Sequence, residues 1–337
     1  MIWLGIAFSY SCIPQEVAAD FSILGANESR QIHFALDNRL KVVAQGAISD
    51  DGTTYFPAVV PQPVVNLTSG KTIYIENIRI GVNRETQNRM VGTQWQWGFF
   101  KSQRQELYRK FDFLGSTIVR CAKNDHEWLS GDGQNMVLID TRKQGNSPNS
   151  KVKLTPRVLA DGGQIGIAER FDSAGHGILL SMHRASKDRV EVHKFVASWG
   201  QKFTSHSIIA SAPLPPKAAY RNDAGRLPED FDEGRSTFLY SPDRVGKPPF
   251  GNYKEWLSRE KRWRTLPDIM SGSYFYFAGE LLAAQPGSGG AALSLCSTDG
   301  KKCSKIGPYE WIARSSNEKH LLVRKTTDNT YWLISFK

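Results

Sequence analysis

Apolar and polar residues alternate in short segments along most of the chain, and this alternation restricts the fold more than any other feature. In one such segment Trp95, Trp97 and Phe99 occupy every second position. Because successive side chains of a β-strand point to opposite faces of a sheet, a period of two predicts strands with one buried face. The segment 72–82 has the same pattern with a phase slip at Glu76 and Asn77, which predicts a β-bulge.

The alternation predicts further strands, which are Arg39–Ile48, Ser116–Ala122, Met136–Asp140, Gln164–Glu169, Gly177–Arg184, Arg189–Trp199, Ser207–Ala212, Tyr274–Gly279, Ala292–Cys296, Glu310–Arg314, His320–Lys325 and Thr330–Phe336. Turns rich in Gly, Asn, Asp and Ser separate many of them. We therefore predict an all-β, mainly antiparallel chain that is β-propeller-like or built as two packed β domains. Its 337 residues can bury a sizeable core, and no apolar run approaches the ~18 residues that span a bilayer as a helix.

The region 213–270 differs from the rest because it is rich in proline. Eight of the 16 prolines lie between Pro213 and Pro267, and proline interrupts regular strand pairing. We predict an insertion here, between β-rich regions at 13–212 and 271–337, with the latter closing the same domain. The apolar spacing within 253–266 predicts one helix that presents Trp256, Arg262, Trp263 and Arg264, residue types that dominate protein interfaces.

The formal net charge of +10 raises the question of nucleic-acid binding. The basic residues are scattered, and in the only dense stretch, 254–264, Glu255 and Glu260 interrupt them. No helix-turn-helix, RNA-recognition or zinc-finger signature is present. We therefore predict no nucleic-acid partner, and a solvated basic surface or one matched to an acidic protein.

The N-terminal segment 1–12 ends in a cysteine. An apolar run from Ile2 to Phe8 precedes Ser9, Ser11 and Cys12, which resembles the end of a bacterial lipoprotein signal peptide. Tyr10 departs from that pattern, and no Lys or Arg precedes the run. Two alternatives follow. Either Cys12 carries a lipid that can anchor the protein to a membrane, or the segment is a buried N-terminal strand.

The other three cysteines divide into a pair and a single residue. Cys296 and Cys303 bracket a turn-like stretch, so a hairpin would bring them together as a local disulfide. Their spacing does not match that of zinc knuckles. Cys121 lies inside a predicted strand, where a buried and inert thiol is expected.

Three turns share related lettering at residues 49–52, 130–133 and 297–300. They resemble the Asp-box turn of sialidase-like propellers, in which Ser-x-Asp-x-Gly closes a hairpin, although each lacks one residue of that spacing. Asp and Gly supply the positive φ angles that tight hairpins require. We interpret all three as structural turns.

A lipoprotein-like cysteine, an all-β body and these hairpins together resemble envelope immunity lipoproteins, which neutralise phospholipase effectors of type VI secretion. The resemblance implies a non-enzymatic protein in the bacterial cell envelope, in the periplasm or anchored to the membrane. It implies that the chain binds a cognate toxic lipase and occludes its active site. The partner-binding residues would be Trp256, Arg262, Trp263 and Arg264.

Motifs for catalysis are not found: Gly-x-Ser-x-Gly, His-Glu-x-x-His and the phosphate-binding Gly-rich loop do not occur. If 185–188 forms a two-residue turn, His183 and His193 point to opposite faces and share no metal. We predict no catalytic residue, no metal and no cofactor. The alternative function is a carbohydrate-active β-propeller enzyme or lectin that uses acidic residues such as Asp230 and Asp232.

Overall fold

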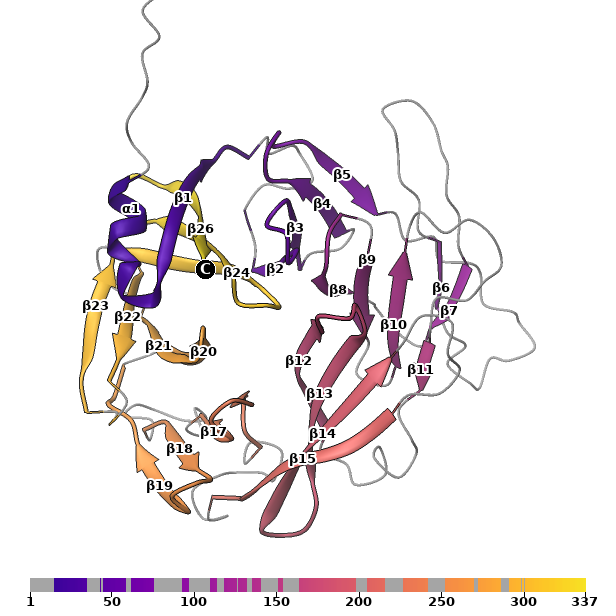
Figure 1. Cartoon of the computed structure of the whole chain (residues 1–337), viewed down its shortest axis with the longest axis vertical. Coiled ribbons are helices and arrows are strands. Elements are labelled where there is room, and N and C mark those ends of the chain that lie inside the picture. The colour runs from indigo at the N-terminus through magenta and orange to yellow at the C-terminus, as the bar shows by residue number, and fades with distance from the viewer. Residues whose placement is uncertain are drawn as a thin grey trace, which may run out of the picture.

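The computed structural model describes residues 15–34, 43, 45–58, 62–75, 93–96, 110–113, 118–125, 127–131, 135–140, 151–153, 164–197, 205–215, 227–241, 252–269, 272–285, 291–297, 299 and 301–337. These residues form a ring of antiparallel sheets around a central axis (Figure 1). The all-β, propeller-like prediction is therefore confirmed.

Six four-stranded units, which we call blades I to VI, can be traced in the described residues. Blade I comprises β2 (Gly46–Ile48), β3 (Thr54–Pro57), β4 (Gln62–Asn66) and β5 (Thr72–Ile75), and blade II comprises β8 (Ile118–Ala122), β9 (Glu127–Gly131), β10 (Asn135–Asp140) and β11 (Lys151–Lys153). Blade III comprises β12 (Gln164–Phe171), β13 (Gly177–Arg184), β14 (Arg189–Ala197) and β15 (Ser205–Pro213).

Blade IV comprises β16 (Asp230–Asp232), β17 (Thr237–Tyr240), β18 (Lys254–Leu257) and β19 (Arg262–Thr265), and blade V comprises β20 (Ser273–Phe277), β21 (Glu280–Gln285), β22 (Ala292–Cys296) and β23 (Cys303–Gly307). Blade VI comprises β24 (Tyr309–Ser315), β25 (His320–Lys325), β26 (Thr330–Phe336) and the N-terminal strand β1 (Ala26–Ile32). A separate hairpin joins β6 (Thr93–Gln96) to β7 (Lys110–Phe113).

The two ends of the chain close the ring in blade VI. Strand β1 pairs antiparallel with β26 over a register that runs from Ala26 opposite Phe336 to Ile32 opposite Tyr331. Strand β2 then pairs in parallel with β24, so blades VI and I form one continuous eight-stranded sheet. Helix α1 (Gln15–Asp20) and the 3-10 turn η1 (Ser22–Leu24) precede β1, and Phe21 packs on the ring of Tyr309.

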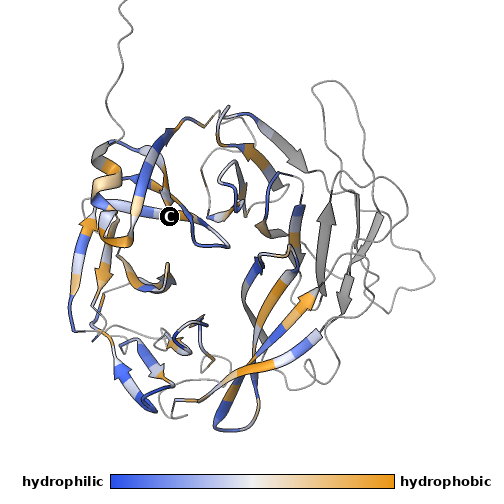
Figure 2. Ribbon diagram, viewed as in Figure 1, coloured by the Kyte–Doolittle hydropathy of each residue, from blue (hydrophilic) through white to orange (hydrophobic). Residues whose placement is uncertain are grey.

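The hydrophobic core is divided among the interfaces between neighbouring blades. One cluster joins blade V to blade VI through residues such as Phe277 and Leu321, and another joins blade III to blade IV through Met182 and Phe238. Figure 2 shows apolar residues distributed over the strands that it colours. Burial between the sheets therefore positions each blade against the next.

The Pro-rich region 213–270 contributes a blade, which corrects the prediction of an insertion with a helix at 253–266. Residues 254–257 and 262–265 form the hairpin β18–β19, with Trp256 opposite Trp263. The apolar residues that suggested a helical period lie instead on two short strands joined by a turn, in which Lys261 has a φ of 50°. The prolines fall outside these strands and therefore do not interrupt the ladder.

Candidate functional site: a cavity inside the ring

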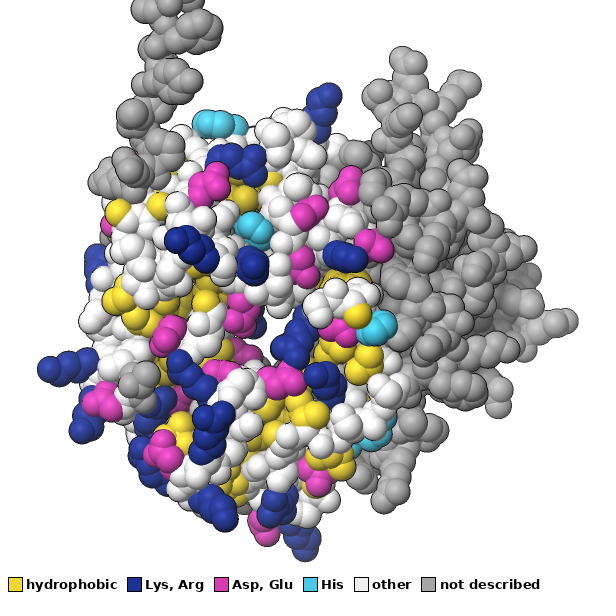
Figure 3. All heavy atoms as spheres, viewed as in Figure 1, with side chains coloured by type: hydrophobic (Ala, Val, Ile, Leu, Met, Phe, Trp, Pro, Cys, Tyr) yellow, Lys and Arg dark blue, Asp and Glu magenta, His cyan; other side chains and the backbone are white. Residues whose placement is uncertain are grey.

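The centre of the ring contains a cavity of about 740 Å³. Its walls come mainly from the first strands of blades III, IV, V and VI and from the hairpin turns that follow them, with Leu180 of β13, and it extends to Gly46 of blade I. Figure 3 shows acidic and basic side chains gathered around the central opening. Cavities of 300–1,000 Å³ are typical of ligand-binding sites in proteins.

The hairpin turns around the cavity have left-handed backbone conformations. Ser236, Ala278 and Glu318 have φ angles of 52°, 51° and 58°, and Gly279, after Ala278, has a φ of 71°. The two-residue turn of Ala278 and Gly279 between β20 and β21 matches the right-handed twist of the strands that it joins. The left-handed region costs a non-glycine residue about 1–2 kcal/mol, so the strand pairing on either side must offset this strain.

Two of the three Ser-x-Asp turns predicted from the sequence form the same hydrogen-bond pattern. The hydroxyl of Ser49 donates to Asp51 Oδ1 over 2.5 Å, and the backbone N–H of Thr54 donates to Ser49 Oγ over 2.9 Å. Ser297 and Asp299 repeat the hydroxyl bond at 2.5 Å. The third predicted turn, at 130–133, extends outside the described residues.

A further turn of this type, not predicted from the sequence, lies in blade VI at 315–320. Ser315 Oγ donates to Asn317 Oδ1 over 2.6 Å, and the N–H of His320 donates to Ser315 Oγ over 2.9 Å. Asn317 therefore takes the position of Asp51 in the blade I turn. The two turns are adjacent in the ring, and each joins the first two strands of its blade.

Side chains from one hairpin turn bind the backbone of the next. Asp50 of blade I accepts hydrogen bonds from the hydroxyl of Ser316 and the N–H of Asn317 at 2.8 and 3.0 Å. Glu318 of blade VI accepts hydrogen bonds from the N–H groups of Ala278 and Gly279 in blade V. Burial raises the pKa of both carboxyl groups, and these hydrogen bonds oppose the rise. The turns therefore form a linked set across blades V, VI and I.

Blade III is linked to blade IV by charged groups. Glu233 of blade IV contacts the guanidinium of Arg170, and Lys194 Nζ lies 3.1 Å from Glu233 Oε1. Burial alone would raise the pKa of Glu233, but the charges of Arg170 and Lys194 outweigh burial and hold it below the usual value. This carboxylate therefore stays ionised at the cavity wall.

Asp230 and Asp232, the acidic residues of the alternative hypothesis, lie on β16 and both line the cavity. Asp230 Oδ2 accepts the N–H of Tyr276 at 3.0 Å and lies 4.0 Å from the guanidinium of Arg314. Asp232 Oδ1 accepts the N–H of Arg235 at 3.1 Å, and Arg235 Nε lies 3.7 Å from Asp232 Oδ2. Strand β16 therefore places two carboxylates at the cavity, with one residue between them.

The cavity differs in charge from the protein as a whole. Its lining contains six carboxylates, from Glu169, Asp172, Asp230, Asp232, Glu233 and Glu318, and two guanidinium groups, from Arg170 and Arg314. The entire chain has a formal net charge of +10. The Debye length at physiological salt is ~8 Å, so a group inside the cavity responds mainly to the local carboxylates.

An Asp–His pair stands at the turn between β12 and β13. His176 Nδ1 lies 2.9 Å from Asp172 Oδ2, and the N–H of His176 donates to Asp172 Oδ1 over 2.8 Å. Burial alone would raise the pKa of Asp172, but the hydrogen bonds from His176 and its charge outweigh burial and lower this pKa. Asp172 and His176 belong to no recognised sequence motif, so this pair was not predicted from the sequence.

A second, smaller cavity of about 280 Å³ lies beside a buried ion pair in blade IV. Arg264 pairs with Glu255 on the neighbouring strand, and their side chains are 9% and 1% exposed. The hydroxyl of Tyr276 donates to Glu255 Oε1 over 2.6 Å. Burial and the Glu255 charge raise the pKa of Tyr276, so this hydroxyl keeps its proton.

The four partner-binding residues predicted from the sequence lie together on the β18–β19 hairpin, but most of them are involved in packing. Trp256 and Trp263 contact each other with ring centroids 5.3 Å apart, and Trp263 also contacts Tyr240 at 5.0 Å. Arg264 is in the buried ion pair. Only Arg262 is exposed, and its Nε lies 2.5 Å from Glu260 Oε2.

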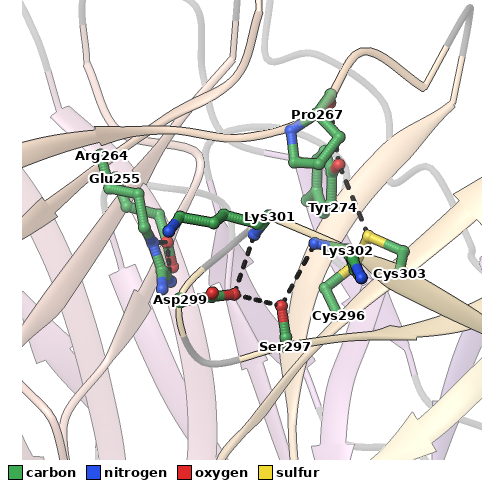
Figure 4. Close-up of a disulfide and its surroundings, with 10 residues drawn as sticks. All are labelled: Glu255, Arg264, Pro267, Tyr274, Cys296, Ser297, Asp299, Lys301, Lys302 and Cys303. Carbon is green, nitrogen blue, oxygen red and sulfur yellow. Dashed lines mark hydrogen bonds and ion pairs between the residues drawn. A yellow bond between two sulfur atoms is a disulfide. The ribbon is translucent and has the colours of Figure 1, made fainter.

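Cys296 and Cys303 are joined by a disulfide across the β22–β23 hairpin, the pairing that their spacing predicted (Figure 4). Figure 4 also shows Tyr274, whose hydroxyl donates to the carbonyl of Pro267 over 2.9 Å. Cys121 is buried as a free thiol, and burial raises its pKa well above the usual value. The predicted lipid site, Cys12, lies outside the described residues.

The predicted register of His183 and His193 is wrong by one residue. His193 lies opposite Ser181, and His183 lies opposite Glu191, because the β13–β14 turn is wider than a two-residue turn. Both imidazoles therefore share one face, with ring centroids 4.4 Å apart, and His193 Nδ1 lies 2.8 Å from His206 Nε2. Within the described ranges, no group of three or more His, Cys, Asp or Glu side chains is arranged to hold a metal ion.

No family model matches the chain, and no curated protein matches it in sequence. Among solved structures, the chain is similar to a luciferin-regenerating enzyme at 9% identity and a TM-score of 0.40, over 87% of this chain and 91% of that chain. It is similar to the WD40 domain of SCAP from fission yeast at 10% identity and a TM-score of 0.39, over 91% and 98% of the chains. A third similar structure is the Cps50 (Swd1) β-propeller domain of Myceliophteria thermophila, at 10% identity and a TM-score of 0.37, over 88% and 98%.

These similarities concern the fold alone, and the proteins that share it differ in function. No helix in the described residues is long and apolar enough to cross a membrane.

Proposed function

We propose that this chain is a non-enzymatic binding protein that contacts a protein partner through the mouth of the central cavity. The observation that carries the proposal is the cavity of about 740 Å³, bounded by hairpin turns that bind one another across blades. A preorganised concave site loses little conformational entropy when it is filled.

The resemblance to envelope immunity lipoproteins suggests the class of partner and the role. The partner would be a toxic lipase of a type VI secretion system, and the role would be immunity in the cell envelope. The cavity supports partner binding in general, and the choice of a lipase rests on the resemblance alone. Blocking an enzyme requires a fitted surface and no chemistry from the inhibitor.

The test is a stoichiometric complex with the lipase encoded beside this gene, measured by size-exclusion chromatography with light scattering. Lys319 is exposed at the turn beside the cavity, and Arg262 is exposed on the outer strand β19. Lys319→Glu and Arg262→Glu are matched charge reversals. Loss of the complex with Lys319→Glu alone supports contact at the cavity mouth, loss with Arg262→Glu alone assigns contact to the outer strand, and absence of any complex refutes the immunity role.

The proposed location in the envelope has its own test. If Cys12 carries a lipid, Cys12→Ser moves the protein out of the membrane fraction. Unchanged fractionation would exclude the anchor while leaving partner binding intact.

The alternative, a carbohydrate-active propeller enzyme or lectin, would use the same cavity. One observation favours it: Asp230 and Asp232 both lie on β16 and line the cavity, and glycoside hydrolysis uses a pair of carboxyl groups. Glycan hydrolysis or binding that is lost with Asp230→Asn, without any protein complex, would support this alternative.

A further inference from the structure

The outer strand of blade III combines unusual length with an absence of charge. Strand β15 has nine residues and is the longest outer strand that the structure describes. It contains no Lys, Arg, Asp or Glu, whereas charged residues occur on the outer strands β1, β11, β19 and β23. The outer strand β5 is also uncharged, but it has only four residues. Charges on an edge strand oppose pairing with another chain, and β15 does not carry this protection.

The N-terminal half of β15 is open to solvent. All four residues from Ser205 to Ile208 are exposed, and Ile208, at 55%, is one of two exposed large apolar side chains in the described part of the chain. A bulge separates this half from the rest of the strand, because Val192 pairs with Ala210 whereas His193 pairs with Ile208. Within the described ranges β15 pairs with β14 alone, so its other edge has no strand beside it.

Contacts within blade III hold this part of β15 in place. The ring of His206 stacks on the ring of Phe195 with centroids 4.7 Å apart. Lys194 lies opposite Ser207, and its Nζ lies 3.1 Å from Glu233 Oε1, so this cation is paired with a carboxylate. The exposed half of β15 is therefore an ordered edge that adds no charge of its own.

Charge selects a second copy of the chain as the occupant of this edge. A two-fold axis places a surface against its own copy, so charges of one sign on that surface repel one another. The chain has a formal net charge of +10, and two copies therefore repel each other wherever cationic surfaces meet. An uncharged edge allows two such chains to approach. An unlike partner would gain from charges opposite to its own, which β15 does not offer.

We propose that two copies of the chain pair through β15 in antiparallel orientation, with a two-fold axis at Ser207. Such an axis places Ser207 opposite itself and Ile208 of one copy opposite His206 of the other. Both side chains are exposed, and they share one face of the sheet because alternate residues of a strand point to the same side. The pair joins two four-stranded blades into one continuous sheet. The inference goes beyond the proposed function, which concerns the mouth of the cavity.

Sedimentation equilibrium of the full chain measures this self-association. An edge contact of this length buries less than the ~1,200 Å² of a standard interface, so we expect a weak dimer with a Kd between about 1 µM and 1 mM. The average mass should therefore rise from that of a monomer towards that of a dimer as the protein concentration increases. A mass that stays at the monomer value up to about 1 mM overturns the proposal.

Salt gives a second measurement on the same protein. The two chains repel through their net positive charge, and raising the NaCl concentration from about 0.05 M to about 0.5 M shortens the range of this repulsion. We therefore expect the dimer to become tighter at high salt. An interface held by ion pairs would become weaker instead, and that result would contradict the proposal.

Charge substitutions at the axis locate the contact. Ser207→Lys and Ser207→Glu each place two like charges opposite one another, and we expect each to weaken self-association about tenfold or more. An equimolar mixture of the two variants places an ammonium group opposite a carboxylate and should restore association. If the mixture associates no more tightly than either variant alone, the two-fold axis at Ser207 is wrong.

Ser304 provides the matched control, because it is an exposed serine on β23, the outer strand of blade V. Ser304→Lys and Ser304→Glu change the net charge in the same way and should leave self-association close to that of the wild type. If Ser304→Lys weakens association as much as Ser207→Lys does, net charge is responsible and the proposal fails. Thermal unfolding checks all four variants, and we expect unchanged Tm values because both serines are exposed.

The test is independent of the proposed function, because self-association is measured on the isolated protein. A monomeric chain that still forms the partner complex would refute the β15 dimer and leave the proposed function in place. A chain that is monomeric alone and loses its partner complex with Ser207→Lys would assign β15 to the partner and overturn the second copy.

Discussion

Blades IV and VI are both four-stranded, but different interactions stabilise them. The strands of blade VI are six or seven residues long, and they place apolar side chains in clusters shared with blades V and I. The strands of blade IV are three or four residues long and include the buried pair Glu255 and Arg264. Long strands gain stability from area, whereas a short-stranded blade depends more heavily on individual contacts.

The largest expected effect is in blade IV. Glu255→Ala leaves the guanidinium of Arg264 buried without its partner, and we expect it to lower the free energy of unfolding by about 4 kcal/mol. Urea unfolding measures the loss. The double variant Glu255→Leu/Arg264→Met should recover most of it, and a single variant that costs less than about 1 kcal/mol would show that blade IV does not depend on the pair.

The next effect is in blade VI. Leu321 is fully buried between blades V and VI, and Leu321→Ala should cost about 3 kcal/mol through lost burial and a residual cavity. The exposed neighbour Lys319→Ala should change stability by less than about 0.5 kcal/mol. Similar losses for both variants would contradict the dependence of blade VI on apolar area.

A smaller effect on stability is expected at Trp263, which packs inside blade IV and was also predicted from the sequence to bind the partner. Trp263 is partly buried against Trp256 and Tyr240, so Trp263→Ala should cost about 2 kcal/mol, below the value for a fully buried tryptophan. Thermal unfolding measures this cost. If Trp263→Ala abolishes a partner complex at full stability, the β18–β19 hairpin belongs to the interface after all.

The smallest effect is a pH dependence that distinguishes the two blades, because residues 227–269 contain no histidine, whereas blade VI contains His320. Burial lowers the pKa of His320 in the folded protein below 6.5. Between the folded-state pKa and the unfolded-state pKa of 6.5, the unfolded chain binds more protons than the folded protein. The stability that neutral His320 contributes is therefore present above pH 6.5 and is lost as the pH falls.

Hydrogen exchange measures this local loss. Between pH 7 and pH 5.5, protection at residues 315–320 should fall before protection in blade IV, after correction for intrinsic exchange rates. His320→Gln should remove the difference. Equal loss of protection in both blades would contradict the assignment to His320.

The strands of blade VI could be predicted from the sequence, whereas those of blade IV could not. His320–Lys325 and Thr330–Phe336 alternate over six and seven residues, and the structure places β25 and β26 at these bounds. The blade IV strands are too short to show a period of two. On the β18–β19 hairpin, Trp256 and Trp263 are also spaced as they would be on one face of a helix. Their cross-strand contact decides the structure, and a sequence window does not contain it.

Some residues that line the cavity could be identified from the sequence, but their arrangement around it could not. Asp230 and Asp232 were identified as acidic residues, but Glu318 and Asp172 come from other blades and meet them only after the ring has closed. No local pattern encodes a distance between residues in different blades. The register of His193 was missed for a related reason, because one additional residue in a turn reverses the face of a whole strand.

The pairing of β1 with β26 also sets the order in which the protein can mature. Strand β1 leaves the ribosome before every other strand of blade VI and β26 leaves after them, so blade VI cannot be completed until β26 has been translated. Until then the edge of β1 that pairs with β26 is open, and other chains could occupy it. Because such long-range pairing is slow, a nascent chain has time to meet a chaperone before it acquires a closed ring.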